Sequence, residues 1–173
     1  MFKKSKLKYL LLLSISLVII FASFYFKNEL ARLGSFGLIG IFLINFFSTV
    51  TLFLPNFSAV TVVAGGSVYN PILVAIVATL GGALGDSSSY VVGRSGREVF
   101  VKEEGRYFKI IYNVFNETGF IIIFLLALIP NPVFDAFGII AGGLKYSFKR
   151  YFLAMLLGRF LRNLLLAYLG KAL

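Results

Sequence analysis

The feature that most constrains this chain is an apolar run interrupted in its middle by helix-breaking residues. Residues 120–143 are almost entirely apolar, yet they contain Pro130, Asn131, Pro132 and Asp135. Proline lacks a backbone N–H group and disfavours helical geometry in the residue before it, so a straight helix is not expected to cross this segment. The apolar pieces on either side are about 10 residues long, about half of a membrane span. The run therefore predicts a helical hairpin that enters a membrane and turns back at the prolines.

The same design occurs earlier in the chain. Pro55 and Asn56 interrupt another apolar run, which continues to Gly65 and Gly66. A shift of about 77 positions superimposes the two regions, and we interpret this as an internal duplication. The matched positions are Pro55 with Pro132, Phe57 with Phe134, Gly65 and Gly66 with Gly142 and Gly143, Gly81 with Gly158, Asp86 with Asn163, and Gly93 with Gly170.

Composition places the chain among integral membrane proteins. Of its 173 residues 59% are hydrophobic and only 14% are charged, unlike a soluble domain. Its net charge of +10 is attributed to anionic lipid and membrane topology, and no nucleic acid partner is predicted. The chain has no cysteine and no histidine, which excludes disulfides, Cys or His metal ligation and Ser-His catalysis. We predict no enzyme, no metal and no cofactor.

The order of segments predicts the topology. Four lysines precede the uncharged run Tyr9–Phe26, about the length of a membrane span; a signal peptide is the alternative, but an uncleaved anchor with a cytoplasmic N-terminus is favoured. The expected divisions are an anchor at 1–32 and a duplicated domain at 33–173, with repeat 1 at about 40–94, a cytoplasmic connector at 95–117 and repeat 2 at about 118–171.

Each predicted repeat is a re-entrant hairpin followed by one full span, Ile72–Val92 or Phe152–Leu169. A re-entrant hairpin returns the chain to the side of the membrane from which it entered, whereas a span carries it to the other side. The second repeat is therefore expected to be inverted relative to the first. The predicted fold is thus an all-α integral membrane protein with an inverted repeat and an extra N-terminal transmembrane helix, multi-pass in the plasma membrane. The spacing of Phe108, Ile111 and Phe115 favours a short amphipathic surface helix in the connector, with a solvated linker as the alternative.

Four ionisable residues within the predicted membrane segments are the main candidates for function, because charges in hydrocarbon are costly. Arg159 and Arg162 suit a phosphate group, and carboxylates would hold or release them; buried ion pairs, such as Asp135 with Arg159, are the purely structural alternative. The substrate path is predicted from Asp86, Asp135, Arg159, Arg162, Arg94, Asn56 and Asn131. Hairpin tips are predicted at Pro55, Pro130 and Pro132, and close helix packing at Gly65, Gly66, Gly142 and Gly143.

These residues resemble the VTT-domain superfamily, which includes the bacterial DedA membrane proteins and the SNARE-associated Golgi proteins. The second half is most similar to the branch containing vacuole membrane protein. The resemblance covers about Gly40 to Lys171 and implies facing re-entrant hairpins and lipid transport: phospholipid scrambling in the eukaryotic branch, and translocation of polyprenyl-phosphate lipids in the bacterial one. It is carried by residues 129–135, Gly138, Gly142, Phe152, Gly158 and Arg159, and in the first repeat by Gly82, Gly85, Asp86, Tyr90, Gly93 and Arg94.

The chain departs from the bacterial DedA pattern at four positions. Asn45 and Phe57 stand where DedA proteins have acidic residues, and Ala127 and Val133 stand where they have arginines. The expected function is therefore a flippase or scramblase of phospholipid or polyprenyl-phosphate lipid, with passive scrambling favoured over proton-driven transport. The alternatives are an ion- or proton-coupled small-solute transporter and a non-transporting membrane-organising protein. Glycine-rich faces and small size are compatible with a homodimer.

Overall fold

The computed structural model describes residues 36–50, 57–100, 106–129 and 133–172, and every regular element in these ranges is a helix. For residues 57, 97–100, 106–111 and 133 only the backbone is described. The predicted N-terminal anchor and the predicted hairpin tips, Pro55, Asn56, Pro130, Asn131 and Pro132, lie outside the described residues. The helices are α3 (Leu38–Val50), α4 (Phe57–Val68), α5 (Pro71–Phe100), α6 (Arg106–Leu128), α7 (Val133–Gly143) and α8 (Phe148–Ala172).

Two helices are long and apolar enough to cross a membrane. They are Pro71–Gly96 within α5 and Phe148–Ala172, each with a mean hydropathy of 1.5. The apolar parts of the other helices are shorter, and α4 and α7, with 12 and 11 residues, extend about 18 and 16 Å against a hydrocarbon core of about 30 Å. The structure thus confirms an all-helical arrangement with two candidate membrane spans over the residues that it describes.

Both long helices extend beyond their predicted ends. In α5, the Asn70 side chain accepts a hydrogen bond of 2.9 Å from the Ile72 N–H group, and Pro71 occupies the first turn, where no backbone N–H is needed. The predicted span ends at Val92, whereas the apolar helical stretch runs to Gly96 and the helix to Phe100; Arg94 is exposed and so does not require the helix to stop. The expected connector at 95–117 is accordingly not a separate surface helix: α5 continues to Phe100 and α6 already begins at Arg106.

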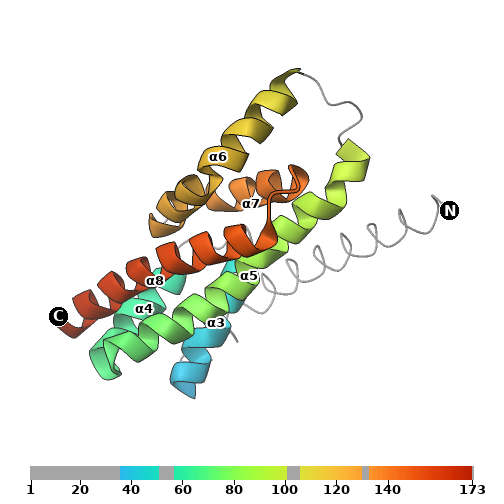
Figure 1. Cartoon of the computed structure of the whole chain (residues 1–173). Helices are drawn as coiled ribbons and strands as arrows, with labels where there is room; N and C mark the ends of the chain where they lie inside the picture. The colour runs from blue at the N-terminus through green and yellow to red at the C-terminus, as the bar shows by residue number, and fades with distance from the viewer. Residues whose placement is uncertain (1–35, 51–56, 101–105, 130–132, 173) are drawn as a thin grey trace.

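The two long helices run in opposite directions. Thr79 of α5 contacts Asn163 of α8, and Asp86, two turns later in α5, contacts Arg159, which comes earlier in α8. Residue numbers therefore rise along one helix and fall along the other, as the crossing ribbons show (Figure 1). This antiparallel pair forms the centre of the described bundle.

The shorter helices pack in a reciprocal manner around the antiparallel pair. Helix α3 packs on α5 and α6 packs on α8, each on the long helix that follows it, whereas α4 packs on α8 and α7 packs on α5 (Figure 1). Each long helix is thereby flanked by one helix from its own half and one from the other half.

Glycines allow the crossed contacts to be close. A Cβ atom on Gly66 would collide with the backbone of Ala167, and one on Gly142 would collide with the backbone of Tyr90. Gly66 and Gly142 thus occupy equivalent places, 76 positions apart, while Ala167 and Tyr90 are 77 apart. The predicted matching of Gly66 with Gly143 is therefore one residue out of register, because each short helix is placed by its contact with the other half.

Apolar side chains cover much of the outside of the long helices, as expected of surfaces in contact with lipid. On α8, Leu153, Leu157, Leu161 and Leu165 are exposed at helical spacing. Two apolar clusters lie inside. One contains Tyr151, Met155 and Ile123 among its members, and the other is Ile41, Val62, Val74, Ala78 and Ala167.

A tyrosine hydroxyl joins α5 by a hydrogen bond to the turn between α7 and α8. The buried Tyr90 side chain donates a hydrogen bond to the backbone carbonyl of Tyr146. We expect Tyr90→Phe to lower the free energy of unfolding by about 1 kcal/mol or more, because the buried carbonyl loses its donor. Unfolding in detergent followed by circular dichroism would measure this. Tyr168→Phe is the control, since Tyr168 is 48% exposed; equal effects of the two changes would contradict the assignment.

Candidate functional site

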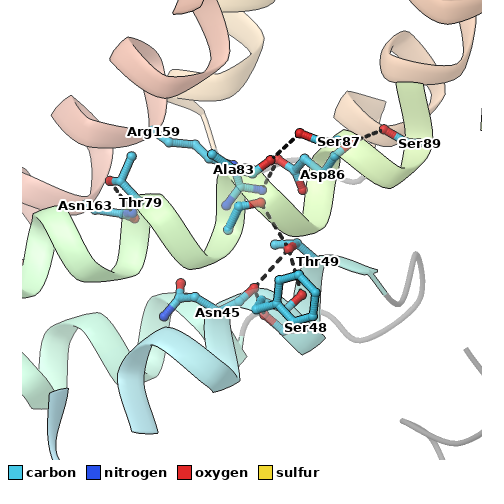
Figure 2. A network of polar contacts seen from close by, with 12 residues as sticks. Asn45, Ser48, Thr49, Thr79, Ala83, Asp86, Ser87, Ser89, Arg159 and Asn163 are labelled. Carbon is cyan, nitrogen blue, oxygen red and sulfur yellow. Dashed lines mark hydrogen bonds and ion pairs between the residues drawn. The ribbon is translucent and has the colours of Figure 1, made fainter. Parts of the chain in front are cut away.

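A buried ion pair lies where α5 and α8 cross. The guanidinium Nη2 of Arg159 contacts the Asp86 carboxylate, and the two side chains are 6% and 1% exposed. Figure 2 shows Arg159 reaching from α8 to Asp86 on α5. The crossing itself is close, because a Cβ on Gly82 would collide with Nη1 of Arg159. Since Gly82 and Arg159 are 77 positions apart, the arginine lies where equivalent positions of the two halves meet.

The ion pair uses only part of the hydrogen-bonding capacity of Arg159. Its Nε and Nη1 atoms are buried and have no hydrogen-bond partner. The face of the Phe134 ring lies 5.9 Å from the guanidinium carbon, within the range of a cation–π contact. Guanidinium donors form a planar fork that matches phosphate and carboxylate oxygens. These unpartnered N–H groups can therefore donate hydrogen bonds to an oxygen of an anion.

The other two predicted intramembrane charges lie beside this pair. Asp135, in the first turn of α7, is half-buried, and its charge interacts with those of Asp86 and Arg159. Arg162, one turn after Arg159, interacts with the same two charges, and its Nε is buried with no hydrogen-bond partner. No described residue forms an ion pair with Asp135. The structure therefore brings all four charges together, with Asp86 rather than Asp135 as the ion-pair partner of Arg159.

Aromatic side chains line the α7 side of the pair. Tyr151 is fully buried, and its hydroxyl lies 3.4 Å from the backbone carbonyl oxygen of Asp86. The rings of Tyr90 and Phe134 pack on Tyr151, with centroids 5.0 and 6.3 Å away. Neither Tyr151 nor Phe134 was among the predicted site residues, since aromatic residues in an apolar run give no sign of which charge they will face.

Uncharged polar groups continue the site toward α3. Asn163 donates a 3.1 Å hydrogen bond to the Thr79 hydroxyl, and the Thr49 hydroxyl of α3 lies 3.2 Å from the Gly82 carbonyl oxygen. The amide nitrogen of Asn45 donates to the Ile41 carbonyl at 2.8 Å, whereas its oxygen is buried with no hydrogen-bond partner. Figure 2 shows these groups extending from the ion pair along α5 to α3. In the sequence, these groups could have been found as polar residues within apolar helices.

The remaining predicted site residues are more scattered. Arg94 lies two turns after Asp86 in α5 and is exposed, so it is not part of the charged cluster. Among the packing glycines, Gly65, Gly66 and Gly142 lie at close contacts, but a Cβ on Gly143 would meet only the Gly93 carbonyl oxygen, at 3.7 Å. In the described ranges no group of three or more acidic, histidine or cysteine residues is placed to hold a metal ion.

Comparison with known families gives one match. The family model described as the VTT domain matches residues 54–172, which include α4 to α8 and all four charges of the cluster. No curated protein and no solved structure matches the chain.

Proposed function

This chain belongs to the VTT-domain family, and from that premise we propose that it moves lipid between the leaflets of the plasma membrane. The transported lipid carries a phosphate, as in a phospholipid or a polyprenyl-phosphate lipid. Its headgroup passes along the polar groups between α5 and α8 while its acyl chains stay in the bilayer. The protein supplies a path and performs no covalent chemistry.

The observation that carries this proposal is the set of free guanidinium donors of Arg159 at membrane depth. A buried N–H group without an acceptor is unfavourable. Arg159 has two such nitrogen atoms, which favours a role in donating hydrogen bonds to an anionic group. Arg162, with its own buried and unpartnered Nε, supplies a second cation one turn away. A phosphate is the lipid group with the charge and oxygen geometry to meet them.

We further propose that the two halves form an inverted repeat of re-entrant hairpins, with the N-terminus in the cytoplasm. The antiparallel α5 and α8 and the reciprocal packing of α4 and α7 support this arrangement. In such proteins substrates bind where the repeats meet near the middle of the membrane. The ion pair of Asp86 and Arg159 occupies the corresponding place here.

The test is lipid movement in proteoliposomes containing an acyl-labelled fluorescent phospholipid and quenched from outside by dithionite. Wild-type protein is expected to expose inner-leaflet lipid to quenching. Arg159→Lys keeps a cation beside Asp86 but loses the planar fork, so we expect movement to slow about tenfold, the effect of one charged hydrogen bond. Asp135→Asn is expected to slow it as well.

Arg150→Lys is the matched control, because Arg150 is an exposed residue at the start of the same helix. It should leave the rate unchanged. Wild-type rates equal to those of empty liposomes, with the helical fold intact by circular dichroism, would refute lipid movement. Equal rates for Arg159→Lys and wild type would refute the assigned path.

A second candidate, proton-coupled transport of a small solute, is favoured by one observation. Asp135 is a half-buried carboxylate without an ion pair to any described residue, and such groups inside membranes serve as proton relays. This candidate predicts solute uptake that depends on an imposed proton gradient and stops in Asp135→Asn, with no movement of labelled lipid.

A further inference from the structure

The charges of the cluster balance. Asp86 and Asp135 supply two negative charges, and Arg159 and Arg162 supply two positive charges. Asp86 and Arg159 form an ion pair, and Asp135 and Arg162 each interact with both members of that pair. With all four groups ionised the cluster therefore has no net charge to offer a ligand, although Arg159 and Arg162 both keep donors without partners.

Binding a phosphate at Arg159 has a consequence for Asp86. The pair is more than nine-tenths buried, and a phosphate bound to the unpartnered Nε and Nη1 atoms of Arg159 shares the guanidinium with the Asp86 carboxylate. If the arriving headgroup is only anionic, one guanidinium faces two anions and an uncompensated negative charge is left inside the membrane, which is strongly unfavourable. If the headgroup also carries a cation, that cation compensates the carboxylate.

We propose that this site selects lipids whose headgroup carries both a phosphate and an ammonium group, over lipids with a net negative headgroup. The inference rests on the proposed function and specifies its substrate. The phosphate binds the Arg159 fork, with Arg162 nearby, and the ammonium group binds Asp86, with Asp135 nearby. Each charge of the headgroup then faces an opposite charge of the cluster, so no uncompensated charge is left in the membrane. The aromatic face of Phe134 borders the same place and suits an ammonium group.

The experiment compares four lipids labelled on the acyl chain, so that the headgroups are unmodified: phosphatidylethanolamine, phosphatidylcholine, phosphatidylglycerol and phosphatidic acid. Each is present in trace amounts in vesicles of one fixed composition and salt concentration. For wild type we expect the two zwitterionic lipids to move about tenfold faster than the two anionic lipids, the effect of one charged partner.

Asp86→Asn separates a selective role from a structural one. It gives the cluster a net positive charge, so we expect the ratio of zwitterionic to anionic rates to fall about tenfold. A pair that only holds the helices together would slow all four lipids by the same factor. Asp135→Asn changes the net charge by the same amount and leaves the ion pair of Asp86 and Arg159 in place. It is the variant to use if Asp86→Asn does not fold. Arg150→Lys should keep the wild-type ratio.

The outcomes distinguish this inference from the function on which it rests. Movement of all four lipids at equal rates would overturn the selectivity and leave lipid movement standing, as would an unchanged ratio in both aspartate variants. Movement of none would overturn the proposed function itself. Uptake of water-soluble glycerophosphoethanolamine into the same vesicles would show that the recognised headgroup belongs to a soluble solute, and would overturn a lipid substrate.

Discussion

Replacing Arg159 with glutamine is expected to lower the free energy of unfolding by about 3 to 5 kcal/mol, the usual effect of removing one member of a buried ion pair. The Asp86 carboxylate is 1% exposed and would remain in the membrane without its ion-pair partner. Glutamine also fills less of the space beside Gly82, against which the arginine packs. Unfolding of purified protein in detergent, followed by circular dichroism, measures the loss.

The double variant Asp86→Asn/Arg159→Gln is the control for this prediction. It removes both charges, so no unpaired charge is left, and its loss of stability should be much smaller than the sum of the two single losses. A double-mutant cycle gives the interaction energy directly. Additive losses, or an Arg159→Gln variant as stable as wild type, would show that the two side chains are not coupled in the folded protein.

Two neighbouring glycines of α7 are expected to respond very differently to the same substitution. Gly142→Ala places a methyl group against the backbone of α5 at Tyr90 and Arg94, and backbone has little room to move, so we expect a loss of about 2 kcal/mol or more. Gly143→Ala meets its first neighbour at 3.7 Å, an ordinary contact. Its stability should be unchanged or raised by a few tenths of a kcal/mol, because alanine favours helix over glycine.

The same pair of variants also tests how α7 is positioned. Asp135 lies two turns before Gly142 on the same helix, so forcing α7 away from α5 should slow lipid movement in Gly142→Ala and leave Gly143→Ala near the wild-type rate. Unfolding in detergent measures the stability of each variant, and the proteoliposome assay measures its rate of lipid movement. Equal effects at the two positions would mean that α7 packs on α5 in a different register.

Much of the fold could be predicted because it depends on local properties of the chain. Apolar runs interrupted by prolines and glycines separate helices of different length, and the family match agrees with the motifs around Asp135 and Asp86. The helix ends were less predictable. The helix that contains the predicted span Ile72–Val92 continues to Phe100, since an exposed arginine after an apolar run does not end a helix.

The sequence by itself determined the class of this protein, its two long apolar helices and the presence of four charges within its apolar helices, because hydropathy and helix-breaking residues act over a few turns. Only the tertiary structure decided that Arg159 pairs with Asp86, that its other donors stay without partners, and that Tyr151 and Phe134 border the pair. The ion pair joins residues from opposite halves of the chain across the antiparallel crossing of α5 and α8. Their register depends on where glycines such as Gly82 and Gly142 allow two backbones to approach, which is a property of packed surfaces and not of any single segment.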